Sequence, residues 1–237
     1  MAAPDHPGPH PAFVLHRRAY SNTSLLLECL TAANGRFPVI ARGVRARSPG
    51  GAGLLQPFVP LLIGWSGRGE VKTLTSFEIN GAAIDLEGRA LYCGFYVNEV
   101  LMRLLERHDP HEALFGLYRE TLAGLAADNE IERILRRFER LLLTELGYGL
   151  LLERDAESGA HIDPDRRYHY ELERGPLPVR AASADTVKGS TLLALAQDRR
   201  LDGEERKEAR RLMRRVLAHY LGDRPLKSRE LFGSACG

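Results

Sequence analysis

The sequence predicts an α+β fold, in which an N-terminal five-stranded β-barrel precedes an all-helical C-terminal region with an irregular inserted segment. Two observations predict this order. Short runs rich in Val, Ile, Leu and Phe, broken by turn residues, fill residues 12–82. Near Gly88 the spacing of apolar residues changes from two to about 3.6, which is the period of an α-helix. The chain of 237 residues is long enough for one large domain or two modest ones.

Five runs in the first part of the chain have the composition of β-strands. Asn34-Gly35 is a strong turn signal between the second and third runs, and Gly67-Arg68-Gly69 is typical of a tight turn between the last two. Five short strands are the number that forms an OB-fold barrel, although another small barrel or sandwich also fits the pattern. The expected strands are residues 13–17, 24–31, 37–44, 58–65 and 70–79.

The remaining segments predict several helices and one irregular insert, and they set the domain boundaries. Helical periodicity runs through residues 91–105, 114–125 and 129–146, and returns at 190–197 and 204–221. Glycines and prolines interrupt residues 150–185, which we expect to be irregular apart from one possible strand at 168–172. We therefore expect a disordered tail at 1–11, an OB-fold domain at 12–82 and a helical domain at 83–237. The glycine-rich loop 45–56 should be mobile and exposed.

Composition and motifs exclude several classes of function. No apolar run approaches the roughly 20 residues that a membrane span needs, and residues 1–11 lack the apolar core of a secretory signal, so we expect a cytoplasmic protein. The motifs G-x-x-x-x-G-K-[ST], G-x-S-x-G and H-E-x-x-H are absent. The polar clusters at 108–111 and 161–169 contain His and Asp, but they are more simply loops than metal sites. We expect no catalytic residue, no cofactor and no metal.

Basic residues are concentrated in the predicted barrel, although the net charge of the whole chain is only +2. The first 80 residues contain eight Lys and Arg against four Asp and Glu. A basic OB-fold barrel can hold single strands through phosphate contacts and base stacking. Phe37, Phe58, Trp65 and Phe77 could supply the stacking, or could simply be core. The residues expected to bind DNA are Arg36, Arg42, Arg45, Arg47, Arg68 and Lys72.

Two predicted helices carry basic stripes opposite their apolar faces. One stripe consists of Arg133, Arg136, Arg137 and Arg140, and the other of Arg206, Lys207, Arg210, Arg211, Arg214 and Arg215. Residues at such spacings share a helix face. The stripes could be solvated faces with intrahelical ion pairs, or they could line a groove for an acidic peptide or a phosphate backbone.

An ordered set of sequence blocks resembles the RecO family of bacterial recombination mediators, in its gammaproteobacterial type. The blocks lie at residues 12–16, 24–27, 56–62, 67–74, 91–100, 136–139, 146–149 and 225–232, so they extend over nearly the whole chain. The resemblance implies an OB-fold domain followed by a helical domain. It also implies binding of single- and double-stranded DNA and annealing of complementary strands. Some members carry four zinc-binding cysteines after the central helices, whereas residues 150–185 contain no cysteine.

The resemblance also implies protein partners. Such proteins bind the acidic C-terminal tail of single-stranded DNA-binding protein (SSB), and with RecR they help RecA to load. It places the SSB-tail contacts on Arg136, Lys207 and Arg211, which lie on the two basic stripes. We expect a monomer that associates with the nucleoid. Two alternatives remain: an OB-fold nucleic-acid binder whose helices are only structural, and an enzyme with an unrecognised site.

Overall fold

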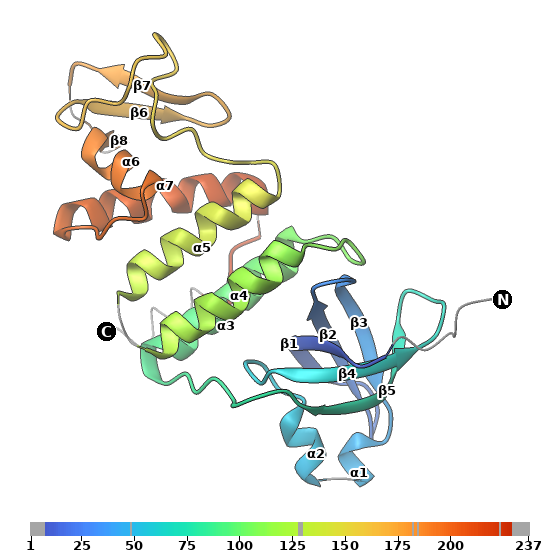
Figure 1. The fold of residues 1–237 in the computed structure, drawn as a ribbon. Helices are drawn as coiled ribbons and strands as arrows, with labels where there is room; N and C mark the ends of the chain where they lie inside the picture. Colours follow the sequence, from blue (N-terminus) through green and yellow to red (C-terminus); the bar gives the residue numbers. More distant parts are fainter. Residues whose placement is uncertain are drawn as a thin grey trace. The chain divides into compact units, whose positions relative to one another are not determined.

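The structure is a computed structural model that describes residues 8–47, 49–127, 130–181, 183, 185–222 and 224–228 (Figure 1). The chain groups into two compact units by its contacts. The first, here called the barrel unit, comprises Met1–Ala127 and Pro225–Gly237, and the second, the helical unit, comprises Asp128–Arg224. Most of the tail expected at 1–11 lies outside the described residues, but β1 already begins at His10.

Five strands form a closed barrel at the beginning of the chain, in the order β1-β2-β3-β5-β4. β3 and β5 run parallel, whereas the other neighbouring strands, including the closing pair β1 and β4, are antiparallel. This closure confirms the OB-like barrel that the sequence predicts. The strands are β1 (His10–Ala19), β2 (Leu25–Thr31), β3 (Gly35–Ala41), β4 (Leu61–Ser66) and β5 (Lys72–Ile79).

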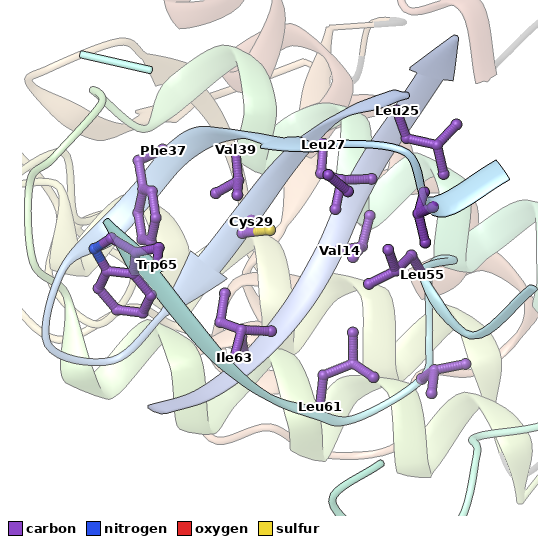
Figure 2. Packing of buried hydrophobic residues seen from close by; sticks show 14 residues of the cluster. Val14, Leu25, Leu27, Cys29, Phe37, Val39, Leu55, Leu61, Ile63 and Trp65 are labelled. Carbon is purple, nitrogen blue, oxygen red and sulfur yellow. The ribbon is translucent and has the colours of Figure 1, made fainter. Parts of the chain in front are cut away.

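Apolar side chains from the strands fill the barrel, as Figure 2 shows. Val14, Leu27 and Val39 are completely buried, and the rings of Phe37 and Trp65 pack with centroids 4.9 Å apart. Phe58 is also buried. Of the two interpretations of these aromatic residues, the structure therefore supports the core for Phe37 and Trp65, whose rings pack inside the barrel.

Two short helices replace the mobile loop that we expected at residues 45–56. They are α1 (Val44–Arg47) and α2 (Pro49–Leu54). Leu55 follows them and is fully buried in the barrel core, and the Arg17 guanidinium donates a 2.9 Å hydrogen bond to the Ala52 carbonyl oxygen. A buried anchor and a hydrogen-bonded backbone order the segment despite its glycines, so the expectation of an exposed loop is wrong.

Two long helices, α3 (Gly88–Leu104) and α4 (Glu112–Ala126), belong to the barrel unit. The buried Asn98 amide of α3 donates to the Leu15 carbonyl oxygen of β1 at 2.9 Å. The Tyr118 hydroxyl of α4 donates to the Asn98 side-chain oxygen at 2.7 Å. Because buried polar groups need partners, this chain of hydrogen bonds fixes both helices against the first strand.

Among its described residues, the helical unit contains three helices and a small sheet that was expected only in part. The helices are α5 (Ile131–Glu145), α6 (Gly189–Ala196) and α7 (Gly203–Leu221). Strands β6 (Arg167–Glu171), β7 (Gly175–Val179) and β8 (Thr186–Lys188) pair in the order β7-β6-β8. The α+β class is confirmed, and the possible strand at 168–172 is β6, but the second strand of this segment, β7, was not expected. Pro176 and Pro178 do not prevent a strand here, because they lie on an edge strand, where a missing N–H is tolerated.

Glu208 of α7 ties the helix to the sheet. Its carboxylate accepts hydrogen bonds from the Arg167 guanidinium at 2.8 Å, the Lys188 backbone N–H at 2.9 Å and the Thr191 hydroxyl at 2.8 Å. Burial by itself raises the pKa of Glu208, but these bonds outweigh it and hold the pKa below the ordinary value of 4.5. The ionised carboxylate is thus the form that the folded unit stabilises.

We expect the stabilisation by Glu208 to be pH-dependent. With its folded pKa lowered, its contribution is fully present above pH 4.5 and is lost as the pH falls through the folded value. Urea unfolding of the native chain and of Glu208→Gln should therefore differ most at neutral pH and converge in acid. A difference that stays constant from neutral pH into acid would contradict this assignment, and Glu204→Gln, on the exposed face of α7, is the matched control.

Candidate nucleic-acid and peptide interfaces

One end of the barrel carries four exposed arginines, Arg17, Arg18, Arg42 and Arg45, here called the basic end. The strand register brings them together, because Ala19 pairs with Leu25 and Leu25 pairs with Ala41 on the next strand. The end of β1, with Arg17 and Arg18, therefore lies at the same end of the barrel as Arg42, which follows β3. α1 begins directly after this point, and the Arg45 guanidinium donates to the Ser21 carbonyl oxygen at 3.1 Å.

A hollow of about 410 Å³ opens at this end of the barrel. None of its lining residues is acidic. Three guanidinium groups on its wall create a positive potential that favours phosphate oxygens, which guanidinium groups can bind through paired hydrogen bonds. The lining residues are Arg17, Arg18, Ala19, Leu25, Arg45, Ala52 and Gly53.

Of the six residues predicted to bind DNA, only Arg42 and Arg45 have side chains at the basic end. Lys72 lies beside Val39 at the start of β5, and its ammonium donates to the Gly67 carbonyl oxygen at 3.1 Å. Arg68, in the turn between β4 and β5, is exposed. This turn precedes Lys72 in the chain. Because β5 runs parallel to β3, the turn lies towards the beginning of β3, whereas Arg42 follows the end of β3. The side chain of Arg47 lies outside what the structure describes.

Arg36 corrects the prediction most clearly, because it is buried. Its guanidinium forms a 3.0 Å ion pair with Glu28 and donates to the Leu105 carbonyl oxygen at 2.8 Å. Arg107, from the α3–α4 connection, pairs with Glu28 and with Glu70. Arg36 therefore joins the barrel to this connection and presents no guanidinium face to a phosphate.

Sequence reasoning had left Arg17 and Arg18 out of the site. The signal that could have found them is their position at the end of the first strand, after the buried run 12–15. Consecutive residues of a strand point to opposite faces, so one of a pair of arginines normally faces solvent. Here both are exposed and both line the hollow.

On α5, Arg136 is buried rather than solvated. Its Nη2 atom donates to Glu139 at 2.7 Å, whereas its Nε and Nη1 atoms have no hydrogen-bond partner among the described residues. Such unpaired buried donors are unfavourable, and an oxygen of a ligand would satisfy them. Arg133 and Arg137 pair with Asp198, which precedes α7, at 3.2 and 3.4 Å.

On α7 the basic stripe is exposed, as the sequence pattern indicated. Lys207 forms a 3.3 Å ion pair with Glu204 of the preceding turn, and the Arg211 guanidinium donates to the Thr186 carbonyl oxygen at 3.2 Å. The structure thus places Lys207 and Arg211 on one helix face and gives Arg136 a buried partner on α5. The exposed basic residues of the stripe are Arg206, Lys207, Arg210, Arg211 and Arg214.

The polar clusters that we weighed as metal sites do not converge. His108 contacts the Glu70 carbonyl oxygen at 3.1 Å, and His111 pairs with Asp109 at the same distance. His161 lies 3.3 Å from the Arg154 guanidinium. Within the described ranges, no three His, Cys, Asp or Glu residues gather closely enough to hold a metal ion. No described helix combines the length and apolar character that a bilayer crossing needs.

An OB-like barrel with a basic end, followed by an arginine-rich helical unit, defines a nucleic-acid-binding class of protein. Comparison with known proteins gives the family. Residues 10–82 match the family described as recombination protein O N terminal, and residues 86–230 match recombination protein O C terminal. The chain belongs to the RecO family, and it is a DNA-repair and recombination protein of a non-enzymatic class.

The similarity to individual members extends over most of each chain. The DNA repair protein RecO of Methylococcus capsulatus is 54% identical over 94% of this chain and 92% of its own length. That of Nitrosospira multiformis is 46% identical over 93% of both chains. That of Alkalilimnicola ehrlichii is 48% identical over 94% of this chain and 89% of its own.

Proposed function

We propose that this chain is a recombination mediator of the cytoplasm, associated with the nucleoid and monomeric by itself. It binds single- and double-stranded DNA, anneals complementary strands and engages the acidic C-terminal tail of SSB. With RecR it promotes loading of RecA onto coated strands during gap and double-strand-break repair. The DNA-binding domain is residues 12–82 and the peptide-binding domain residues 83–237. The observation that carries the proposal is the basic end of an OB-like barrel in a chain of the RecO family.

DNA binding follows from the chemistry of the basic end. Three exposed guanidinium groups line a hollow with no acidic lining residue, and Arg42 is exposed at the same end of the barrel. Phosphate binding at such a surface releases counterions and does not depend on base sequence. Both properties suit a protein that must hold any strand while it finds its complement. Arg68 and Lys72 extend the proposed DNA contact to a second position on the barrel.

Recognition of an acidic tail follows from the arginines of the helical unit. A peptide of this kind ends in carboxylates and a free chain terminus, all of which accept hydrogen bonds from guanidinium and ammonium groups. Lys207 and Arg211 lie exposed on α7. Arg136 contributes two buried donors with no partner among the described residues. We propose that these three side chains hold the SSB tail.

Annealing of SSB-coated complementary oligonucleotides tests the proposal. The chain should accelerate annealing without any nucleotide, and the acceleration should vanish when SSB lacks its acidic tail. Because a hydrogen bond to a charged group contributes about 1.5–3 kcal/mol, Lys207→Ala and Arg211→Ala should each weaken tail binding by roughly 10- to 100-fold and leave annealing of naked strands unchanged. A requirement for ATP would indicate an enzyme, and failure to anneal either substrate would indicate a plain nucleic-acid binder.

A further inference from the structure

A second cavity, of about 680 Å³, lies in the barrel unit next to the hollow of the basic end. Arg17 lines both. The cavity is formed where β1, the segment before β4 and the segment before α3 meet. Most of its wall is apolar, in contrast to the hollow, and its apolar and aromatic members are Leu15, Pro57, Phe58, Val59, Ala83, Ile84, Leu86, Leu91 and Phe95.

Two phenylalanine rings form the aromatic part of this wall. The Phe58 and Phe95 centroids are 5.2 Å apart and their planes are inclined by 58°. Phe58 is 6% exposed, whereas Phe95 is 38% exposed. Phe95 therefore presents ring surface that the described protein leaves uncovered.

The aromatic wall is held rigidly. Phe58 has a φ of +69°, in the left-handed region that non-glycine residues rarely adopt, and its carbonyl oxygen accepts a 3.1 Å hydrogen bond from the Ile84 N–H. Gly94 lets α3 approach, because a Cβ there would lie only 2.9 Å from the Phe58 ring. Strained backbone persists where the surroundings determine it fully, and such strain gathers at binding sites.

Polar groups occupy the rest of the lining. His16, Gln56 and Asp85 are exposed, and together they offer an imidazole, an amide and a carboxylate. Arg17 stands where the cavity adjoins the hollow. Together, the cavity and the adjoining hollow therefore present guanidinium groups, an aromatic wall and hydrogen-bonding groups.

We propose that this cavity, here called the base pocket, receives an unstacked nucleobase of a single strand whose phosphates lie on the basic end. The inference rests on the proposed DNA binding and adds to it where a base is held. These groups match the parts of a nucleotide, which combines a charged phosphate, a flat ring and polar ring edges. Base stacking on aromatic side chains is sequence-tolerant, so the pocket would accept different bases.

Binding of two oligonucleotides of equal length tests the base pocket, one of oligothymidylate and one with abasic sites throughout. Both carry the same phosphates, but only the first has bases. The native chain should prefer the first by roughly 5- to 100-fold, the range that one stacked base provides. Phe95→Leu, which keeps apolar volume but removes the aromatic face, should abolish the preference and leave abasic binding unchanged. Phe95→Tyr should retain it.

The outcomes separate the base pocket from the proposed function. If the native chain binds neither oligonucleotide, the DNA-binding function fails. If it binds both equally, or if Phe95→Leu binds like the native chain, DNA binding stands and the base pocket is wrong. Binding of an apolar peptide that both Phe95 variants retain would assign the cavity to a protein partner instead. Ile79→Ala removes another exposed apolar side chain from the barrel and should change nothing.

Discussion

Replacing Arg18, Arg42 and Arg45 together with alanine should weaken binding of a single-stranded oligonucleotide by about 100-fold at 0.1 M salt. For single strands the logarithm of the affinity falls with the logarithm of salt concentration by about 0.7 for each neutralised phosphate. Loss of three contacts therefore flattens that slope by about two. Titrations by fluorescence anisotropy at several salt concentrations measure both quantities. All three side chains are exposed, so the fold should survive.

The matched control removes the same charge elsewhere. Arg166, Arg174 and Arg200 are exposed on the helical unit, and their triple alanine variant changes the net charge by the same three units. It should leave the slope unchanged if the strand follows the barrel. If the control flattens the slope and the barrel variant does not, the DNA lies on the helical unit.

Arg36→Ala should chiefly lower stability, because that side chain is buried in an ion pair.

Glu139→Leu should lower the free energy of unfolding by about 3–5 kcal/mol. This carboxylate is completely buried and forms a 2.7 Å ion pair with Arg136. Removing one partner of a buried pair leaves the other charge uncompensated in a poorly polarisable interior, which is strongly destabilising. Urea unfolding followed by circular dichroism gives the difference, provided that the transition remains two-state.

The double variant Arg136→Met with Glu139→Leu separates stability from binding. Replacing both members of a buried ion pair with apolar side chains of similar volume is often neutral for stability, so most of the lost free energy should return. Binding of an acidic SSB-tail peptide should not return, since the Arg136 donors are gone. If the double variant binds the peptide as tightly as the native chain, Arg136 has no part in the site. If it stays as unstable as Glu139→Leu, the pair is not what limits stability.

Local patterns were enough to predict the barrel. Apolar runs of strand length and the Asn34-Gly35 turn gave all five strands, and Gly35 indeed has a φ of +63°. Helical periodicity gave α3 to α7 in order. These features depend on neighbours in the sequence, and so they can be read without knowing the tertiary contacts.

The site depended on contacts that sequence spacing does not reveal. Arg36 and Arg42 both lie at or near the predicted third strand, and nothing local distinguishes them. Arg36 is nevertheless buried, because its guanidinium binds Glu28 and the carbonyl oxygen of Leu105, which is distant in the sequence. Phe37 and Trp65, for which the sequence left stacking and core open, lie in the core, whereas Phe95, expected only as a helix residue, has a partly exposed ring. The prolines of β7 predict an interrupted segment, because their position on an edge strand depends on pairing with β6, which the local sequence does not show.

The contact of α3 and α4 with β1 limits how this barrel can be used outside its own chain. Phe13 is almost completely buried, with ring centroids 5.6 Å from Phe115 and 5.1 Å from Tyr118. A fragment that ended at residue 82 would therefore leave this ring uncovered and the Leu15 carbonyl without its Asn98 donor. The two family matches meet between residues 82 and 86, but the barrel strands depend on contacts with helices that lie beyond that boundary. We therefore expect a stable fragment to need α3 and α4 as well as the five strands.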